Sequence, residues 1–103
     1  MMKKTEKGVG YLVEHEYEMA AEEWGEKFAS LHEGAAVLRE EIEEALDDAH
    51  YMNLAFCGMW EAVKENDNEK VAEQLKKIYK EAILGASEMI QVAAMAMKMS
   101  KTL

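Results

Sequence analysis

Apolar residues between positions 38 and 63 recur at alternating spacings of four and three, and this repeat leaves few folds open to the chain. A seven-residue repeat is the signature of α-helices that pack as in coiled coils. The pattern therefore predicts one long helix over residues 31–65. The repeat consists of Leu38, Ile42, Ala45, Ala49, Met52, Phe56, Met59 and Val63.

Two further helices are predicted, over residues 9–28 and 69–100. The first has an apolar stripe at helical spacing, and the second begins with one and then becomes apolar on almost every side between residues 82 and 97. The chain has 103 residues, no proline and only six glycines, whereas sheet folds need frequent turn residues. The sequence thus predicts one all-α domain spanning residues 1–103. The two stripes are Val13, Tyr17, Ala20, Trp24 and Phe28, then Val71, Leu75, Ile78 and Ala82.

The predicted helix boundaries rest on capping residues. Ser30 and Glu33 have the spacing of a capping box, in which the serine accepts a hydrogen bond from the first turn. Asn66, Asp67 and Asn68 provide turn and N-cap residues between two periodic segments. Long antiparallel helices joined by short connections follow from these boundaries.

The apolar segment at 82–97 predicts self-association. A helix that is apolar all round is buried all round, and three helices of one short chain cannot surround it. Small domains also bury only about 60% of the surface that the unfolded chain exposes. We therefore expect a symmetric homodimer whose subunits share their cores, although the sequence does not distinguish a dimer from a tetramer.

Charge and cysteine content narrow the class of protein. The chain has 21 acidic and 12 basic residues, which argues against a nucleic-acid polymer as partner because phosphate binding needs a basic face. No apolar stretch reaches the roughly 20 residues of a membrane span, and the first residues do not read as a signal peptide. The single cysteine, Cys57, is expected to be a small buried residue in a cytoplasmic protein.

The acidic excess is concentrated on the middle helix. Residues 31–66 hold nine acids and two bases, and seven of these acids lie between positions 33 and 48. With Leu38 set at zero and 100° per residue, Glu41 lies about 60° and Glu44 about 120° to one side of the core stripe. Glu40 and Glu43 point toward solvent. The run thus divides into a solvated face and a group that borders the core.

The third helix offers matching groups. Between residues 82 and 97 its polar side chains are Ser87, Glu88 and Gln91, and the last two share a face. A buried carboxylate protonates, pairs with a cation or binds a metal. Pairing with Lys98 is one account. Alternatively, two helices that each carry an i, i+3 pair of oxygen ligands build a site for a hard cation such as Mg²⁺.

Both motifs together resemble the MazG-like all-α nucleoside triphosphate pyrophosphatases, in particular their short phage and prophage members. Residues 40–44 have the form EExxE, and Glu88 to Gln91 resemble the family's second element, ExxD, with glutamine in the aspartate place. The resemblance covers residues 30–98 and includes the flanking runs 32–38 and 91–96.

This resemblance implies an Mg²⁺-dependent hydrolase with a dimeric or tetrameric, four-helix-bundle-like core. Its reaction converts an NTP or dNTP into the monophosphate and pyrophosphate, in nucleotide house-cleaning or in control of phage nucleotide pools. Glu41, Glu44 and Glu88 would hold the metal, with Gln91 as the fourth ligand. Glu40 would act with Glu41 and Glu44 in catalysis, by orienting them or holding the attacking water. The implied substrate-binding residues are Trp24, Tyr51, His15 and Lys98.

Gln91 keeps a second function open. An amide can ligate through its carbonyl oxygen but carries no charge, so the site loses one negative charge relative to the family pattern. The chain could therefore be a catalytically inactive relative that binds nucleotide, or a plain helical dimerisation module. The sequence does not identify the preferred base or sugar.

Overall fold

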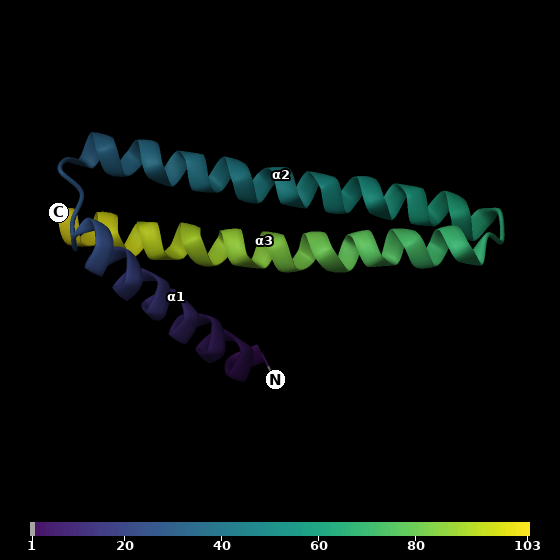
Figure 1. The fold of residues 1–103 in the computed structure, drawn as a ribbon, viewed down its shortest axis with the longest axis horizontal. Helices are drawn as coiled ribbons and strands as arrows, with labels where there is room; N and C mark the ends of the chain where they lie inside the picture. The colour runs from purple at the N-terminus through teal and green to yellow at the C-terminus, as the bar shows by residue number, and fades with distance from the viewer. Residues whose placement is uncertain (1) are drawn as a thin grey trace. The chain divides into compact units, whose positions relative to one another are not determined.

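A computed structural model describes residues 2–103, and within this range it contains three α-helices and no strand (Figure 1). Helix α1 spans Met2–Trp24, α2 spans Leu31–Lys64 and α3 spans Asn68–Thr102. The predicted all-α class and the number of helices are confirmed. The ends of α2 and α3 lie within two residues of the predicted ends.

The chain forms two compact units. The three-helix unit contains the residues up to Ile42 together with Glu88–Leu103, and the hairpin unit contains Glu43–Ser87. The division runs through α2 and α3, so both helices contribute to both units. The three-helix unit combines α1 with the first part of α2 and the last part of α3, whereas the hairpin unit has only the remaining segments of α2 and α3.

The predicted bounds of the first helix, 9–28, are wrong at both ends. The helix begins at Met2, because the three lysines and one glutamate before Val9 are good helix formers although they carry no apolar stripe. It ends at Trp24, because Gly25 adopts φ +93° and donates its N–H to the Ala21 carbonyl at 2.8 Å. Phe28, predicted to lie on the helix stripe, instead belongs to the connection to α2.

Gly25 and Gly10 are predicted to respond with opposite signs to the same substitution. Gly25→Ala should lower the free energy of unfolding by about 1–2 kcal/mol, because an L-residue is strained at φ +93°. Gly10→Ala, in an exposed turn of α1 with open space around the new methyl group, should raise it by about 0.5–1 kcal/mol. Urea denaturation of the two variants measures both changes, and equal signs would contradict the assigned conformation of Gly25.

The caps of α2 and α3 follow the predicted chemistry. Ser30 Oγ accepts the N–H of Glu33 at 3.1 Å, as expected from the capping box. Asp67 Oδ1 accepts the N–H of Lys70 at 3.1 Å and so caps α3. Asn66, at φ 55°, ends the preceding helix in the left-handed region that asparagine tolerates. Local hydrogen bonds therefore explain why these boundaries could be predicted.

The core of the three-helix unit joins α1, the connection after it and α3. Tyr17 donates its hydroxyl to the Glu26 carbonyl at 3.1 Å, and the Phe28 N–H is bound by Thr102 Oγ1 at 3.0 Å. Gly34 lets the Phe28 ring approach α2 closely, since a Cβ on this glycine would lie 2.9 Å from the ring. The buried apolar residues of this core are Val13, Tyr17, Phe28, Ala94 and Met95.

The hairpin unit has a thin interior. Its buried apolar side chains are all alanines, at positions 45, 55 and 62. Gly85 of α3 lies against α2, because a Cβ there would meet the Asp48 Cβ at 3.5 Å. Small residues at the contact thus bring the two helices close together but bury little apolar surface.

The repeat on α2 is only half buried within the chain. Ala45 is buried and Met52 is half-buried, whereas Phe56 and Val63 from the same repeat are exposed. The prediction of one core stripe is therefore wrong for a single chain. The more buried side of this part of α2 includes Ala45 and Met52 from the predicted stripe and Ala62 from outside it.

The expectation that residues 82–97 are buried all round is also not met within one chain. Ala94 and Met95 are buried, whereas Ile83, Leu84 and Met89 are exposed. These three apolar side chains of α3 are therefore left uncovered by the chain itself. In the part of the chain that the structure describes, however, no helix has an apolar stretch of the length that crossing a membrane requires.

Candidate metal centre

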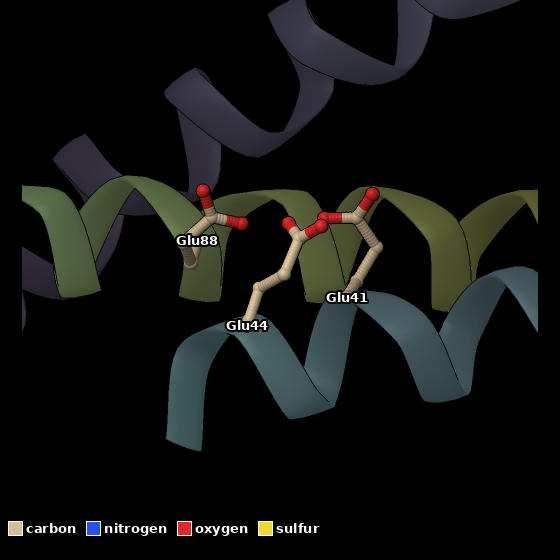
Figure 2. Close-up of side chains that lie close together, drawn as sticks. All are labelled: Glu41, Glu44 and Glu88. Atoms are coloured by element: carbon tan, nitrogen blue, oxygen red, sulfur yellow. The ribbon is translucent and has the colours of Figure 1, made fainter. Parts of the chain in front are cut away.

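Three glutamates from two helices gather in a single cluster. Figure 2 shows Glu41 and Glu44 rising from α2 and Glu88 from α3, with their carboxylates directed toward one another. Each offers one carboxylate oxygen, and these three oxygens lie within 4.8 Å of one another. Three of the four side chains that were predicted as metal ligands, all but Gln91, therefore lie together.

Helical spacing accounts for this cluster. Glu41 and Glu88 both belong to the three-helix unit, and Glu44 follows Glu41 by one turn of the continuous helix α2. Glu41 is half-buried and Glu44 is exposed, as their predicted angles of about 60° and 120° from the core stripe require. Glu40 and Glu43 are exposed as predicted, but Glu44, which was predicted to border the core, is exposed as well, so burial separates only Glu41 from these glutamates.

Glu88 is the least satisfied member of the cluster. Its Oε2 atom is buried and has no hydrogen-bond partner among the described residues. Pairing with Lys98 does not occur, because the Lys98 ammonium lies 4.6 Å from the centroid of the Phe28 ring. A buried acceptor without a donor is costly, and neighbouring carboxylates add repulsion. The local electrostatics therefore favour a bound cation.

The donor set fits Mg²⁺. This ion takes oxygen ligands at 2.0–2.1 Å, so two oxygens bound to it lie roughly 3–4 Å apart, and it usually keeps several waters. Small side-chain rotations would bring three oxygens from within 4.8 Å into that arrangement. Glu41, Glu44 and Glu88 could thus hold the ion while water or phosphate oxygens complete its coordination.

Gln91, the predicted fourth ligand, has a partner on α1. Its Nε2 donates to Glu16 Oε2 at 2.8 Å, in a partly buried hydrogen bond that joins α3 to α1. Because the Nε2 end of the amide faces Glu16 on α1, the carbonyl oxygen is the Gln91 atom that could bind a metal ion. Sequence reasoning missed Glu16, although its place beside the buried Val13 and Tyr17 on α1 is a signal of partial burial.

Replacing Gln91 by aspartate should be harmful on its own. Gln91→Asp, which creates the ExxD element of the family that the sequence resembles, places a carboxylate beside Glu16. We therefore expect a loss of about 1–2 kcal/mol in unfolding free energy without divalent cations. Adding Glu16→Gln supplies an amide donor and should recover most of this loss. Urea denaturation in a chelating buffer measures the unfolding free energies of the wild type, the single variant and the double variant. Equal stability of the single and double variants would contradict a stabilising role for the hydrogen bond between Gln91 and Glu16.

The predicted substrate-binding residues lie in different surroundings. Tyr51 lines a cavity of about 420 Å³ in the hairpin unit, between α2 and α3. Trp24 and His15 lie exposed on α1, and Trp24 is 72% accessible. Lys98, which the resemblance implies as a substrate-binding residue, is buried against Phe28. Cys57 is exposed, which corrects the expectation that its thiol is buried.

Two cationic residues that sequence reasoning missed share the cavity with Tyr51. Lys77 and Lys80 of α3 line it together with Gln74 and Glu81, whose Oε2 is buried without a hydrogen-bond partner among the described residues. The two lysines are three apart and so share a helix face. They offer the cavity positive charge in an otherwise acidic chain.

Comparison with known proteins identifies no relative. No protein-family model matches the chain, and neither a curated protein nor a solved structure is significantly similar to it.

Proposed function

We propose that this chain is an Mg²⁺-dependent nucleotide pyrophosphohydrolase of the MazG-like kind, which converts an NTP or dNTP into the monophosphate and pyrophosphate. The observation that carries the proposal is the approach of Glu41, Glu44 and Glu88, whose carboxylate oxygens lie within 4.8 Å of one another. The buried, unpartnered Oε2 of Glu88 supports it, because a divalent cation would satisfy this atom. A purely structural carboxylate would be expected to face a lysine.

Each carboxylate has a role in the proposed reaction. Bound Mg²⁺ would neutralise phosphate charge and polarise the attacked phosphorus. Glu41, Glu44 and Glu88 hold the ion, and Glu40 orients them or holds the attacking water. The water oxygen forms a bond to the α-phosphorus while the bond from this phosphorus to the bridging oxygen breaks. Pyrophosphate leaves, and the proton of the water passes to a carboxylate.

The cavity at Tyr51 suits the remainder of the nucleotide. Glu44 and Tyr51 are seven residues apart on the same side of α2, about 10 Å along its axis. The phosphate chain and sugar of a nucleotide span such a distance. Tyr51 would stack on the base, and Lys77 and Lys80 would contact anionic oxygens. Lys98 is not among the proposed phosphate contacts, because its ammonium group lies over the Phe28 ring. Trp24 and His15 remain proposed contacts.

The proposal also covers the compartment, the oligomeric state and the partners of the enzyme. We propose a cytoplasmic homodimer with a four-helix-bundle-like core, acting on free nucleotides and not on a nucleic-acid polymer or at a membrane. The support is the net charge of −9, which repels polyanions, and the apolar surface that a single chain leaves exposed.

A nucleotide-binding protein without turnover is the second candidate. The specific observation in its favour is that Gln91 brings no charge to the site and donates its amide to Glu16. Such a protein would keep Mg²⁺ and nucleotide affinity, because the three glutamates are retained.

The test is direct. The purified protein is incubated with each NTP and dNTP in the presence of Mg²⁺, and monophosphate and pyrophosphate are separated by anion-exchange chromatography. Release from at least one nucleotide, abolished by chelation, is expected. Absence of release together with Mg²⁺-dependent nucleotide binding in calorimetry would favour the second candidate. Absence of both, in folded protein, would overturn the metal site itself.

A further inference from the structure

The cavity at Tyr51 contains a carboxylate to which the proposed reaction gives no role. Among the described residues, two side chains have a buried carboxylate oxygen without a hydrogen-bond partner, those of Glu81 and Glu88. The glutamate cluster accounts for Glu88. Glu81 is half-buried on α3 in the hairpin unit and lines the cavity of about 420 Å³. Because a buried acceptor without a donor is costly, a ligand that donates a hydrogen bond to Glu81 would be stabilised there.

The surroundings of Glu81 favour a hydrogen-bond donor over a second metal ion. In the part of the chain that the structure describes, Glu81 is not among the acidic side chains close enough to share an ion. Lys77 and Lys80 line the same cavity and outnumber the one carboxylate there, so the charge of its wall repels a free cation. Lys77 precedes Glu81 by four residues, the spacing of a helical ion pair, yet Oε2 stays without a hydrogen bond. The wall therefore suits an anionic ligand that also carries a neutral N–H donor.

The amino group of a nucleobase is such a donor. A carboxylate only accepts hydrogen bonds, and glutamate pairs with the N4 amino group of cytosine. Uracil has a carbonyl oxygen in this position, which would face the carboxylate with a second acceptor. Gln74 also lines the cavity, but its amide can turn either its donor or its acceptor toward a base. Glu81 is thus the lining group that favours an amino group over a carbonyl oxygen.

The cavity allows a base to reach Tyr51 and Glu81 together. Its volume lies within the range of about 300–1,000 Å³ that is typical of small-molecule sites. Tyr51 belongs to α2 and Glu81 to α3, so a base that stacks on the ring can present its edge to the carboxylate of the other helix. The last torsion of a glutamate side chain is broad, so the carboxylate can turn its buried oxygen toward the donor.

We propose that Glu81 selects the base, so that the cavity takes nucleotides of adenine, cytosine or guanine, which carry an exocyclic amino group, and rejects those of uracil and thymine. This inference rests on the proposed function, which places the base against Tyr51. Glu81 meets the edge of the base and takes no part in the chemical step. A base without the amino group leaves the carboxylate unpaired, and sites built to hydrogen-bond one group reject analogues that lack it.

Competition between CTP and UTP tests this selection. The two nucleotides differ only at positions 3 and 4 of the base. In an equimolar mixture with Mg²⁺, the wild type should consume CTP at least about 10-fold faster than UTP. Glu81→Gln should reduce this ratio to within about 3-fold, because an amide can also donate to the uracil carbonyl. Equal consumption of both nucleotides by the wild type would overturn the selection and leave the proposed activity intact.

Binding replaces turnover if neither nucleotide is hydrolysed. Titration of the isotope-labelled protein with CTP and with UTP, followed by NMR, then measures the two dissociation constants. CTP should bind at least about 10-fold more tightly than UTP, and Glu81→Gln should remove most of this difference. That result would support the selection although the proposed activity had failed. Equal affinities, or no binding of either nucleotide, would overturn it.

Glu73→Gln is the matched control. It is the same chemical change on α3, at an exposed position outside the cavity. The preference for CTP should stay at the wild-type value. A loss equal to that of Glu81→Gln would overturn the role of Glu81, because the lower charge of the chain would then explain both results. Each variant exchanges a carboxylate for an amide of similar shape, so both should keep the helical circular dichroism of the wild type.

Discussion

Glu88→Gln is expected to lower the rate of pyrophosphate release by a factor on the order of 100 or more. The substitution removes one of the three charged ligands of the proposed metal site, and even loss of a group that only supports a ligand costs about 10–100-fold in metal affinity or activity. Anion-exchange separation of the products at saturating nucleotide measures the rate. A variant with more than about a third of wild-type activity would contradict a ligand role for Glu88.

The melting temperature of Glu88→Gln provides a second test, because it should rise whereas the activity falls. Without divalent cations, Glu88→Gln should raise the melting temperature, because it removes a buried, unpartnered carboxylate oxygen beside two other carboxylates. At ten times its dissociation constant, Mg²⁺ should raise the melting temperature of the wild type by about 5–10 °C and leave that of the variant unchanged. Equal Mg²⁺ shifts in both proteins would show that the ion binds elsewhere.

Glu43→Gln is the control for both measurements. It is the same chemical change on α2, at a position on the solvated face and outside the cluster. Activity and the Mg²⁺-induced shift should stay close to those of the wild type. A loss comparable to that of Glu88→Gln would mean that net acidity of the chain, rather than one site, attracts the cation.

Phe28→Ala is expected to lower the free energy of unfolding by about 3 kcal/mol, the largest effect among substitutions outside the cluster. The Phe28 ring is buried, packs against Gly34 and supports the Lys98 ammonium. Its removal leaves a cavity in the contact that links α1 to both other helices. Urea denaturation at fixed protein concentration measures the change.

Tyr11→Ala is the matched control for Phe28→Ala. It also removes an aromatic ring from the three-helix unit, but Tyr11 is 71% exposed on α1. Its effect on the free energy of unfolding should stay within about 0.5 kcal/mol. Similar losses in the two variants would contradict the assignment of Phe28 to the core.

Features set by nearby residues could be predicted from the sequence. Ser30 and Asp67 cap their helices through bonds that span three residues, so a short window contains all the required information. The approach of Glu41, Glu44 and Glu88 was predictable because helical spacing fixes which side chains border the core. The end of α1 was missed because Gly25 acts through its left-handed backbone conformation, which apolar periodicity does not reveal.

Features set by distant residues could not be predicted. The bond from Gln91 to Glu16 joins residues 75 apart, and the bond from Phe28 to Thr102 joins residues 74 apart. Burial of Lys98 depends on the same long-range packing, because the Phe28 ring that it covers lies in a connection. The repeat on α2 shows which residues are apolar, but not whether its own chain or another one covers Phe56 and Val63.

The alanine interior of the hairpin unit has a consequence for how the protein folds. A buried methyl group contributes roughly 0.8 kcal/mol, whereas ordering one residue of backbone costs roughly 1–2 kcal/mol. Ala45, Ala55 and Ala62 therefore cannot hold residues 43–87 in place by themselves. If a second copy completes this interior, its formation is a second-order process. The folded population, the refolding rate and the protection of these amides from hydrogen exchange then all rise with protein concentration.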